Sequence, residues 1–437
     1  MGESTTRRGF LQQTVGAAAA ASLAAGLASA EESSDDVMPA AQSAPRAALG
    51  ADDPIRIGVI GTGGMGTAHC DAFLRLAKAG KADVRIDVLC DVCDPRAAAA
   101  SKKVDEAQGG QVGTTRDYRQ VLARKDLHGV VIATPEHWHG RQAEDAILAG
   151  KDVYIEKPMT LGLADALRLR KIARANPDVI VEVGTQFVVT PSYKAAQALI
   201  AEGAIGKPVW SQTSYCRNSK EGEWLYYAID PAWQPGVNLD WKAWCGPLGK
   251  APWNPEIYAR WRRYRKYSTG IIGDLLVHQM TPLIMAMNLG WPARVVASGG
   301  HYVDKKMENH DQVNLTIEFE DGHTMVVAGS TCNELGIEKV IRGHKANLYV
   351  GGRTLTLRPE RLYADEIDAR EIPASTEGDD QDNLRLDWLS CIRSRQKPAS
   401  DIELGTKVMV IVDLASRSIW EGKAYAYDRR NQKVRKL

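Results

Sequence analysis

Short apolar runs rich in β-branched residues alternate with Ala- and Leu-rich amphipathic segments between residues 55 and 184. The runs have the length of buried strands, and the segments between them have the apolar spacing of helices. The runs are Ile57–Ile60, Val84–Leu89, Gly129–Ala133, Val153–Ile155 and Val179–Val183. Their alternation predicts βαβ units, and hence a parallel sheet with helices on both faces.

The pattern changes near residue 185. Longer alternating strands follow, and helical spacing returns near the C-terminus. The strands are Val313–Phe319, Thr324–Ala328 and Ala346–Val350, and the helices are Asn383–Arg395 and Thr406–Trp420. We therefore expect an α/β protein in which residues 55–184 form a parallel-sheet domain and residues 185–437 form an α+β domain on a large, mostly antiparallel open sheet. The C-terminal helices should pack back toward the first domain.

The first 30 residues have the features of an export signal. Arg7 and Arg8 precede Phe10-Leu11 and an Ala-rich, weakly apolar run that ends at Ala28-Ser29-Ala30. A twin-arginine pair, an apolar run and a small-residue cleavage site together predict a twin-arginine signal peptide, so we expect the export machinery as a partner and a periplasmic location. Residues 31–54 are Ser-, Asp- and Pro-rich without periodicity, which predicts a flexible linker.

Composition excludes several classes of protein. The 437 residues are 25% charged, with 55 basic and 54 acidic side chains, and removal of residues 1–30 leaves 53 of each. Such a neutral chain is no general nucleic-acid or membrane-surface binder. Outside the leader no stretch has the roughly 18 to 20 apolar residues that a membrane anchor needs. The length predicts two or three domains.

Seven scattered cysteines make a disulfide framework implausible for a chain of this size. Cys90 and Cys93 have the spacing of a redox or half-zinc motif, but no second C-x-x-C or nearby His pair completes a metal site. We interpret them as a structural thiol pair and predict no metal.

A glycine-rich turn follows the first apolar run. Its residues are Gly61, Thr62, Gly63, Gly64, Met65 and Gly66. Glycines at this spacing permit a tight turn and a close approach of the backbone to a pyrophosphate at a helix N-terminus. Asp91, at the end of the next predicted strand, stands where an acidic side chain accepts hydrogen bonds from the adenosine ribose. The turn therefore predicts a dinucleotide-binding domain of the Rossmann type.

Three further groups of polar residues are candidates for a functional site. Thr134, Pro135 and His139 follow the fourth apolar run, and Glu156 and Lys157 follow the fifth, at the sheet edge where ligands bind. Asp274 and His278 are four residues apart and share one face if the segment is helical. An Asp that orients a His is a common acid/base arrangement. Residue types alone also allow a solvated ion pair, a helix-cap histidine and a helix-surface pair.

An aromatic cluster and a basic strip precede Asp274. Residues 210–261 hold seven of the eleven tryptophans, which indicates a core, a subunit interface or a sugar-binding surface. Residues 260–266 carry five cations. We interpret this strip as solvated or inter-subunit, or as a contact for a polyhydroxylated or anionic substrate, in which case Arg262 and Tyr264 are the candidates.

These pieces together resemble the Gfo/Idh/MocA oxidoreductases, named for glucose-fructose oxidoreductase and inositol dehydrogenase. The motifs occur in that family's order, from Ile55 to about Ala426. They are the glycine turn, T-P-x-x-x-H (Thr134, Pro135, His139), E-K-P (Glu156, Lys157, Pro158) and G-x-x-x-D-x-x-x-H (Gly270, Asp274, His278). The resemblance implies a Rossmann domain followed by an open-sheet domain for substrate binding and assembly into a homo-oligomer, a dimer or tetramer.

The resemblance also implies roles for individual residues. Lys157 would be the cation beside the nicotinamide and the substrate hydroxyl, His278 the proton acceptor, and Asp274 its neighbour. The other cofactor contacts would be the glycine-turn residues, Asp91, Thr134, Pro135, His139 and Glu156, and Gln186 would line the cleft between cofactor and substrate. NAD is the expected cofactor and NADP the alternative.

An export signal narrows the function. Free NAD is scarce outside the cytoplasm, so the cofactor should stay tightly bound through turnover. We expect an oxidoreductase that acts on a sugar or cyclitol hydroxyl. An NAD-dependent glycoside hydrolase, resembling glycoside hydrolase family 109, is the second hypothesis; it would oxidise C3 transiently, eliminate the leaving group, add water and reduce the ring again. A noncatalytic nucleotide-binding sensor is the third.

Overall fold

The computed structural model describes residues 41–437, and the predicted signal peptide lies outside them. Six strands form a parallel sheet in the order β3-β2-β1-β4-β5-β6. The strands are β1 (Ile55–Ile60), β2 (Val84–Cys90), β3 (Gly113–Thr115), β4 (Gly129–Ile132), β5 (Asp152–Ile155) and β6 (Val181–Val183). The predicted parallel sheet is confirmed, and the strand order reverses direction between β1 and β4, where doubly wound sheets bind ligands.

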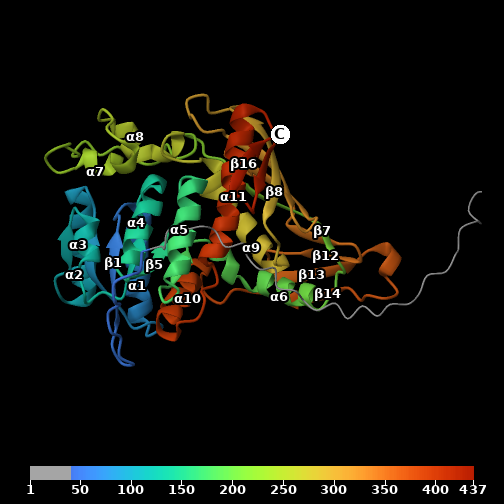
Figure 1. Cartoon of the computed structure of the whole chain (residues 1–437), viewed down its shortest axis with the longest axis horizontal. Helices are drawn as coiled ribbons and strands as arrows, with labels where there is room; N and C mark the ends of the chain where they lie inside the picture. Colours follow the sequence, from blue (N-terminus) through green and yellow to red (C-terminus); the bar gives the residue numbers. More distant parts are fainter. Residues whose placement is uncertain (1–40) are drawn as a thin grey trace, which may run out of the picture. The chain divides into compact units, whose positions relative to one another are not determined.

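Helices cover both faces of this sheet (Figure 1). They are α1 (Gly64–Lys78), α2 (Asp94–Gln108), α3 (Tyr118–Leu122), α4 (Glu136–Leu148) and α5 (Leu163–Ala175). The central strands β4 and β5 are buried at every position, as expected for a sheet covered on both sides. We refer to residues 55–184 as the Rossmann half.

Ten strands form the second sheet, in the order β14-β13-β12-β11-β7-β10-β9-β8-β15-β16. Among its pairings only β7 with β10 is parallel, so the predicted, mostly antiparallel sheet is confirmed. Its strands are β7 (Pro208–Cys216), β8 (Pro292–Gly300), β9 (Gln312–Phe319), β10 (Thr324–Ser330), β11 (Val340–Gly343), β12 (Ala346–Tyr349), β13 (Thr354–Pro359), β14 (Arg370–Pro373), β15 (Tyr425–Asp428) and β16 (Lys433–Lys436).

The remaining helices follow the Rossmann half in the chain. They are η1 (Gln186–Val189), α6 (Pro191–Ala201), α7 (Trp241–Cys245), η2 (Gly246–Leu248), α8 (Pro255–Arg260), η3 (Trp261–Arg263), the π-helical turn η4 (Ile272–Leu276), α9 (Val277–Met287), η5 (Arg361–Tyr363), α10 (Asp380–Ser394) and α11 (Ile402–Glu421). In Figure 1, α11 lies between α5 and the second sheet, and it contacts α5, α9 and β8. One buried apolar cluster therefore runs from the first sheet to the second.

Three features differ from the sequence-based expectation. Residues 41–54 have no regular structure, yet they are held on the Rossmann half rather than free. Ser43 N donates to Asn176 Oδ1, and Ala44 N donates to the carbonyl of Leu148 at the end of α4. The polar C-terminal stretch forms the β15–β16 hairpin at the sheet edge. Lastly, β3 is too short and too polar for its sequence to predict.

Candidate active site

A cavity of about 690 Å³ opens at the carboxyl ends of β1, β2, β4 and β5. The glycine turn and Asp91 line one part of it, and Lys157, Asp274 and His278 line another. Residues from the second half of the chain form the opposite wall. Residues far apart in sequence are thus brought to the edge where a doubly wound sheet binds its ligand.

The glycine turn has the form of a pyrophosphate cradle. Gly61 has a φ of 90°, and a Cβ there would lie 2.8 Å from Thr134 N. A Cβ on Gly66 would lie 1.7 Å from the Gly61 carbonyl oxygen. Gly63 and Gly64 line the cavity where α1 begins, and a Cβ on Gly64 would meet nothing within 4 Å. This open helix N-terminus fits a dinucleotide pyrophosphate, which binds unpaired backbone N–H groups.

The six residues of the turn divide into two groups. Gly61, Gly63, Gly64 and Met65 line the cavity, whereas Thr62 and Gly66 are not among its lining residues. Thr62 is buried, and both its backbone N and its Oγ1 donate to Asp91 Oδ2, at 2.7 and 3.1 Å. Thr62 and Gly66 therefore shape the turn instead of contacting a ligand, a distinction that the motif alone does not make.

Asp91 lines the cavity at the end of β2, as predicted. Its Oδ1 accepts from Cys93 N at 2.9 Å, so the carboxylate is fixed by backbone donors on both oxygens. Arg96 also lines the cavity, and its guanidinium lies 4.5 Å from the ring centre of Tyr258 and 5.0 Å from that of Trp233. The adenosine end of the site is therefore held in place before any ligand binds.

Thr134, Pro135 and His139 all line the cavity after β4. His139 is buried, with Nδ1 2.7 Å from the carbonyl oxygen of Pro158 and Nε2 2.7 Å from that of Thr134. Burial lowers the pKa of His139, and a neutral ring can donate to only one of these oxygens. His139 thus links the segment after β4 to the segment after β5, a structural position next to the predicted cofactor site.

Glu156 is held by a buried chain of side chains. Its Oε1 lies 2.9 Å from Nε2 of His69 on α1, and Arg385 of α10 donates to His69 Nδ1 at 2.9 Å. Because an arginine can only donate, His69 must carry its proton on Nε2 and donate to Glu156. Burial opposes ionisation, but the His69 hydrogen bond lowers the pKa of Glu156 to about 2. This chain of side chains could not be predicted from sequence, since His69 and Arg385 are 316 residues apart.

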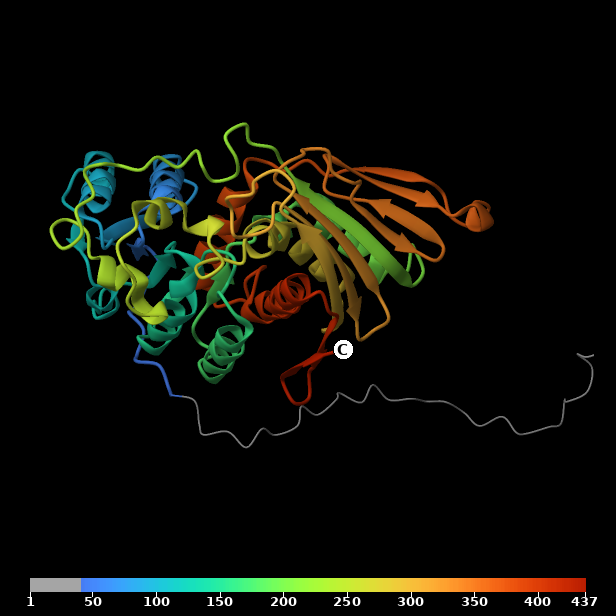
Figure 2. The ribbon, with the colours of Figure 1, turned by 90° about the horizontal axis from the view of Figure 1, so that it is seen from above.

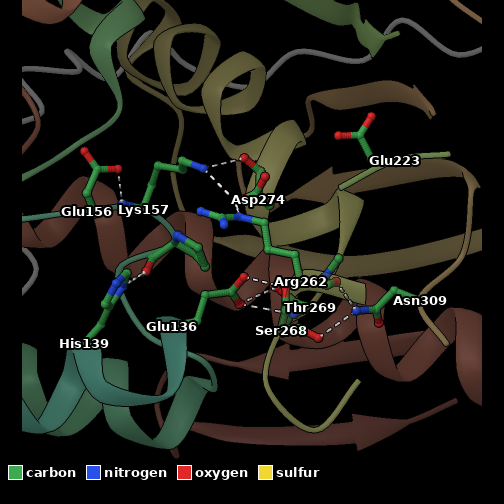
Figure 3. Close-up of polar contacts among 12 residues, drawn as sticks. Glu136, His139, Glu156, Lys157, Glu223, Arg262, Ser268, Thr269, Asp274 and Asn309 are labelled. Atoms are coloured by element: carbon green, nitrogen blue, oxygen red, sulfur yellow. Dashed lines mark hydrogen bonds and ion pairs between the residues drawn. The ribbon is translucent and has the colours of Figure 1, made fainter. Parts of the chain in front are cut away.

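Lys157 and Asp274 form an ion pair at the centre of the site (Figure 3). Lys157 Nζ donates to Asp274 Oδ1 and to the Asp274 carbonyl oxygen, each at 2.9 Å. Arg262 Nε donates to the same Oδ1, also at 2.9 Å. Burial alone would raise the pKa of Asp274, but the Lys157 and Arg262 cations hold it well below its usual range. Asp274 therefore stays ionised, and the three groups together carry one positive charge.

His278 lies on α9, one turn beyond Asp274. Its ring lines the cavity, between Phe187 and Tyr215. Its Nδ1 is buried without a hydrogen-bond partner among the described residues, which leaves Nε2 for a ligand. Burial lowers the pKa of His278 to about 3, and the Lys157 cation acts in the same direction. His278 is thus neutral at physiological pH, as a proton acceptor must be.

The four-residue spacing suggested that Asp274 contacts His278, but Asp274 bonds Lys157 and Arg262 instead. Asp274 and His278 share one cavity, but within residues 41–437 no hydrogen bond joins them, because the carboxylate is engaged by Lys157 and Arg262. Asp274 acts on His278 through its charge, which raises the pKa of the imidazole against the larger effects of burial and Lys157. Gln186 lines the cavity as predicted.

The basic strip is mostly paired. Arg260 bonds Glu256 and Arg263 bonds Asp304, while Arg262 alone reaches Asp274. Tyr264 is not among the cavity-lining residues and packs against the aromatic cluster of Trp241, Trp244 and neighbouring residues. The predicted role of Arg262 at the site therefore has geometric support, and that of Tyr264 has none, because successive residues of the strip point in different directions.

Glu136 is a further buried group that the sequence did not single out. It lies at the start of α4 and accepts from Ser268 Oγ at 2.5 Å and from Thr269 N at 3.1 Å (Figure 3). Asn309 donates to the carbonyl oxygens of Arg262 and Ser268 from the other side. Burial raises the pKa of Glu136 to about 7. These bonds fix the loop that carries Arg262 toward Asp274.

Residues 217–265, which we call the strap, form the outer wall of the cavity. The strap leaves the second sheet after β7 and crosses the Rossmann half, where α7 and α8 lie above its helices (Figures 1 and 2). Leu239 pairs with Cys93, and Asp94 N and Asp240 N exchange hydrogen bonds with the carbonyls of Asn238 and Val92. The Trp244 carbonyl accepts from His137 and Trp138 of α4. Most of the tryptophan-rich segment thus belongs to this outer wall and to a small buried core rather than to a free surface.

Comparisons with known proteins agree with this geometry. Inositol 2-dehydrogenase 1 of Saccharopolyspora erythraea is 31% identical over 155 residues, which are 36% of this chain and 44% of that protein. A glycosyl hydrolase family 109 protein of Streptomyces niveus is 37% identical over 119 residues, 26% of this chain and 23% of that protein. The aligned part spans less than half of either relative.

Solved structures share the whole fold. The oxidoreductase domain protein from Kribbella flavida superposes with a TM-score of 0.67 at 21% identity over 85% of this chain and 98% of that one. Levoglucosan dehydrogenase in complex with NADH and levoglucosan gives a TM-score of 0.64 at 20% identity over 85% of this chain and 99% of that one. At this identity the likeness establishes the fold alone.

Family profiles match most of the chain, beyond the segments aligned with the individual relatives. Residues 55–185 match the oxidoreductase family's NAD-binding Rossmann fold, and residues 197–426 match the oxidoreductase family's C-terminal alpha/beta domain. Since these two profiles cover both halves of the cavity just described, the chain belongs to the Gfo/Idh/MocA family of oxidoreductases.

Proposed function

We propose that the protein is an NAD-dependent oxidoreductase that acts on a hydroxyl of a sugar or cyclitol. The observation that carries this proposal is one cavity that holds a pyrophosphate cradle at one end and Lys157, Asp274 and a neutral His278 at the other. Bound NAD supplies the hydride acceptor. Relatives named inositol 2-dehydrogenase and levoglucosan dehydrogenase support the substrate class.

The side chains divide the work on the substrate hydroxyl. His278 accepts the proton of the hydroxyl as its carbon is oxidised. Lys157 Nζ stabilises the negative charge that develops on the oxygen. Asp274 holds Lys157 in place and is itself held by Arg262. The charges of Asp274 and Arg262 cancel, so the lysine charge remains available to the oxygen.

We propose NAD rather than NADP as the cofactor. The Asp91 carboxylate can accept from a ribose hydroxyl but would repel a 2′-phosphate. Arg96 does not pair with Asp91; it stacks on Tyr258 and Trp233. Calorimetric titration of nucleotide-free protein should show tighter binding of NAD than of NADP. In Asp91→Asn the ratio of the two dissociation constants should move closer to one. Tighter binding of NADP would overturn the role of Asp91.

An NAD-dependent glycoside hydrolase is the second candidate. Two observations favour it: the similarity to glycosyl hydrolase family 109 proteins, and a cavity walled by the strap, which suits a cofactor that is reoxidised without leaving. This reaction uses the same residues, because it begins with the same oxidation of a ring hydroxyl.

One screen separates these functions. Protein purified with its nucleotide is offered sugars, cyclitols and glycosides, and the reduced nicotinamide band and released sugar are followed together. Accumulation of NADH, or reoxidation by a second sugar, supports the dehydrogenase, and release of the leaving group without net NADH supports the hydrolase. Tight NAD binding without turnover of any substrate would favour a nucleotide sensor.

We further propose that the twin-arginine machinery exports the protein to the periplasm and that it assembles there as a dimer or tetramer. The export proposal is supported by Arg7, Arg8 and the Ala28-Ser29-Ala30 site. Among residues 41–437, no helix is long and apolar enough to cross a membrane.

A further inference from the structure

Two adjacent tyrosines of the strap remain open in an otherwise buried aromatic segment. Tyr226 is 50% exposed and Tyr227 37%, whereas Trp224, Trp241 and Trp244 are buried. The two tyrosine rings lie 4.8 Å apart, and both line the active-site cavity. They therefore form an aromatic surface where the cavity meets solvent.

A first series of contacts joins this surface to the proton acceptor. The ring of His278 meets that of Tyr215 edge-on at 6.4 Å, and Arg217 lies 5.9 Å from the centre of the Tyr215 ring. Arg217 pairs with Glu223 at 2.5 Å, and Tyr226 Oη donates to the same Glu223 oxygen at 2.8 Å. The series runs from buried His278 to half-exposed Tyr226, and Glu223, which holds both Arg217 and Tyr226, is buried.

A second series leads to the same place from the charged centre. Arg262 donates to Asp274 and lies 5.8 Å from the ring centre of Tyr227. The two series meet at the tyrosine pair, and all their members except Glu223 line the cavity. The tyrosine pair thus lies one layer outward from the reacting atoms, on the path that a substrate takes inward.

The chemistry of this outer layer matches a neutral polyhydroxylated ring. Aromatic faces pack against the C–H surface of a pyranose, and the Arg217 guanidinium, which lines the cavity and is held by buried Glu223, can donate to its hydroxyls. Arg217 and Glu223 neutralise each other, so the layer selects neither an anion nor a cation. Resting on the function proposed above, we propose that Tyr226 and Tyr227 form an outer subsite for a second sugar ring, linked glycosidically to the ring that is oxidised.

The test compares free sugars with their disaccharides in wild type and variants. The pairs are D-glucose with cellobiose and maltose, D-galactose with lactose, and N-acetylglucosamine with chitobiose. Wild type should prefer at least one disaccharide by kcat/KM. In Tyr226→Ala and Tyr227→Ala the ratio of disaccharide to monosaccharide kcat/KM should fall about tenfold, as expected for loss of one aromatic contact. Tyr302→Ala, an exposed tyrosine outside the cavity lining, should keep the wild-type ratio.

Calorimetry with the same disaccharides on nucleotide-loaded protein provides a readout that does not need turnover. Weaker disaccharide binding in the two variants, with unchanged binding in Tyr302→Ala, supports the subsite. Equal losses for both sugar classes, or a wild-type preference for the free sugars, would overturn it. If no sugar reduces the nicotinamide yet a disaccharide binds through the tyrosines, the proposed reaction fails and the subsite stands.

Discussion

Lys157 owes its position to the residues on either side of it. On one side, Glu156 is fixed by His69, and its Oε2 accepts from the Lys157 backbone N at 3.3 Å. On the other side, the Pro158 carbonyl contacts His139. Buried, hydrogen-bonded neighbours of this kind restrict the backbone, so Nζ reaches Asp274 with little loss of side-chain entropy on binding. Placement of Nζ is therefore a property of several buried groups and not of the lysine alone.

Replacement of His278 tests the proposed proton transfer. His278→Ala should lower turnover by a factor of roughly 10² to 10⁴, which is the rate enhancement that a positioned general base usually contributes. The affinity for NAD should stay nearly unchanged. Lys157→Ala should also lower turnover, and its nucleotide affinity is measured beside that of His278→Ala. Steady-state kinetics with titration of bound nicotinamide measure both quantities.

A matched control comes from a buried histidine in the second sheet. His323 is bonded to Ser211, outside the cavity lining, so His323→Ala should cost stability without a comparable loss of kcat. Near wild-type turnover of His278→Ala across the pH range would show that another group accepts the proton.

Glu136 predicts a dependence of stability on pH. Because burial raises its pKa from 4.5 to about 7, the folded chain binds this proton more tightly than the unfolded chain. The resulting stabilisation is complete below pH 4.5 and is lost as pH rises through 7, a change of roughly 3 kcal/mol in the free energy of unfolding. Glu136→Gln cannot ionise, and its amide can still bond Ser268 and Thr269.

Denaturant unfolding at pH 5, 6, 7 and 8 measures this effect. The difference in unfolding free energy between Glu136→Gln and wild type should shift in favour of the variant as pH rises. The exposed Glu334→Gln should show no such trend. Parallel curves for Glu136→Gln and wild type would mean that Glu136 ionises in the folded chain as readily as in the unfolded one.

At the scale of elements, we expect the strap to control the release of the cofactor. Its residues Trp244 and Tyr258 line the same cavity as Gly63 and Asp91, and its backbone pairs with the segment after β2. A dinucleotide in the cradle is therefore enclosed by backbone that must separate before release. This arrangement supports the proposed retention of NAD through turnover independently of any argument from export.

Weakening the strap should release the nucleotide. Leu239 is fully buried where the strap pairs with Cys93, so Leu239→Ala should speed NAD dissociation by at least about tenfold through the lost packing. The measurements are the nucleotide content after gel filtration and the rate of exchange with added NAD. Lys242→Ala, an exposed position on the same strap, should behave as wild type. Unchanged exchange in Leu239→Ala would show that the strap does not limit release.

Elements were predictable where local patterning alone determines them. The strands β1, β2, β4, β5 and β6 are short β-branched runs, and their length and composition distinguish them from buried helix segments. The β15–β16 hairpin was missed because its residues are mostly polar and its pairing is at a sheet edge. The π-helical turn at Ile272–Leu276 was also missed, since no simple periodicity distinguishes it from the α-helix that follows.

At the scale of the whole molecule, the site was predictable as a set of residues but not as a set of contacts. Motif order placed Lys157, Asp274 and His278 together, and the structure brings all three to one cavity. Spacing of four residues can only indicate a shared helix face, so it suggested that Asp274 serves His278. The actual partners, Lys157 and Arg262, come from other parts of the chain and depend on how the two halves pack.

The enclosed cofactor site has a consequence for export of the whole protein. Its walls come from both halves of the chain, so nucleotide can be trapped only after folding, and the cytoplasm is where nucleotide is abundant. The export proposed above would then require a route that carries folded proteins, and Arg7 and Arg8 would direct it. Arg7→Lys with Arg8→Lys should leave uncleaved precursor in the cytoplasmic fraction, while wild type appears in the periplasm with bound NAD.

Cell fractionation, immunoblotting and nucleotide analysis of each fraction measure this outcome. Arg429→Lys with Arg430→Lys changes another adjacent arginine pair and should be exported normally, which controls for the loss of two arginines as such. Unchanged export of the Arg7/Arg8 variant would exclude the twin-arginine route. Exported wild-type protein without nucleotide would contradict retention by the strap, because a cofactor enclosed before export should remain in its cradle afterwards.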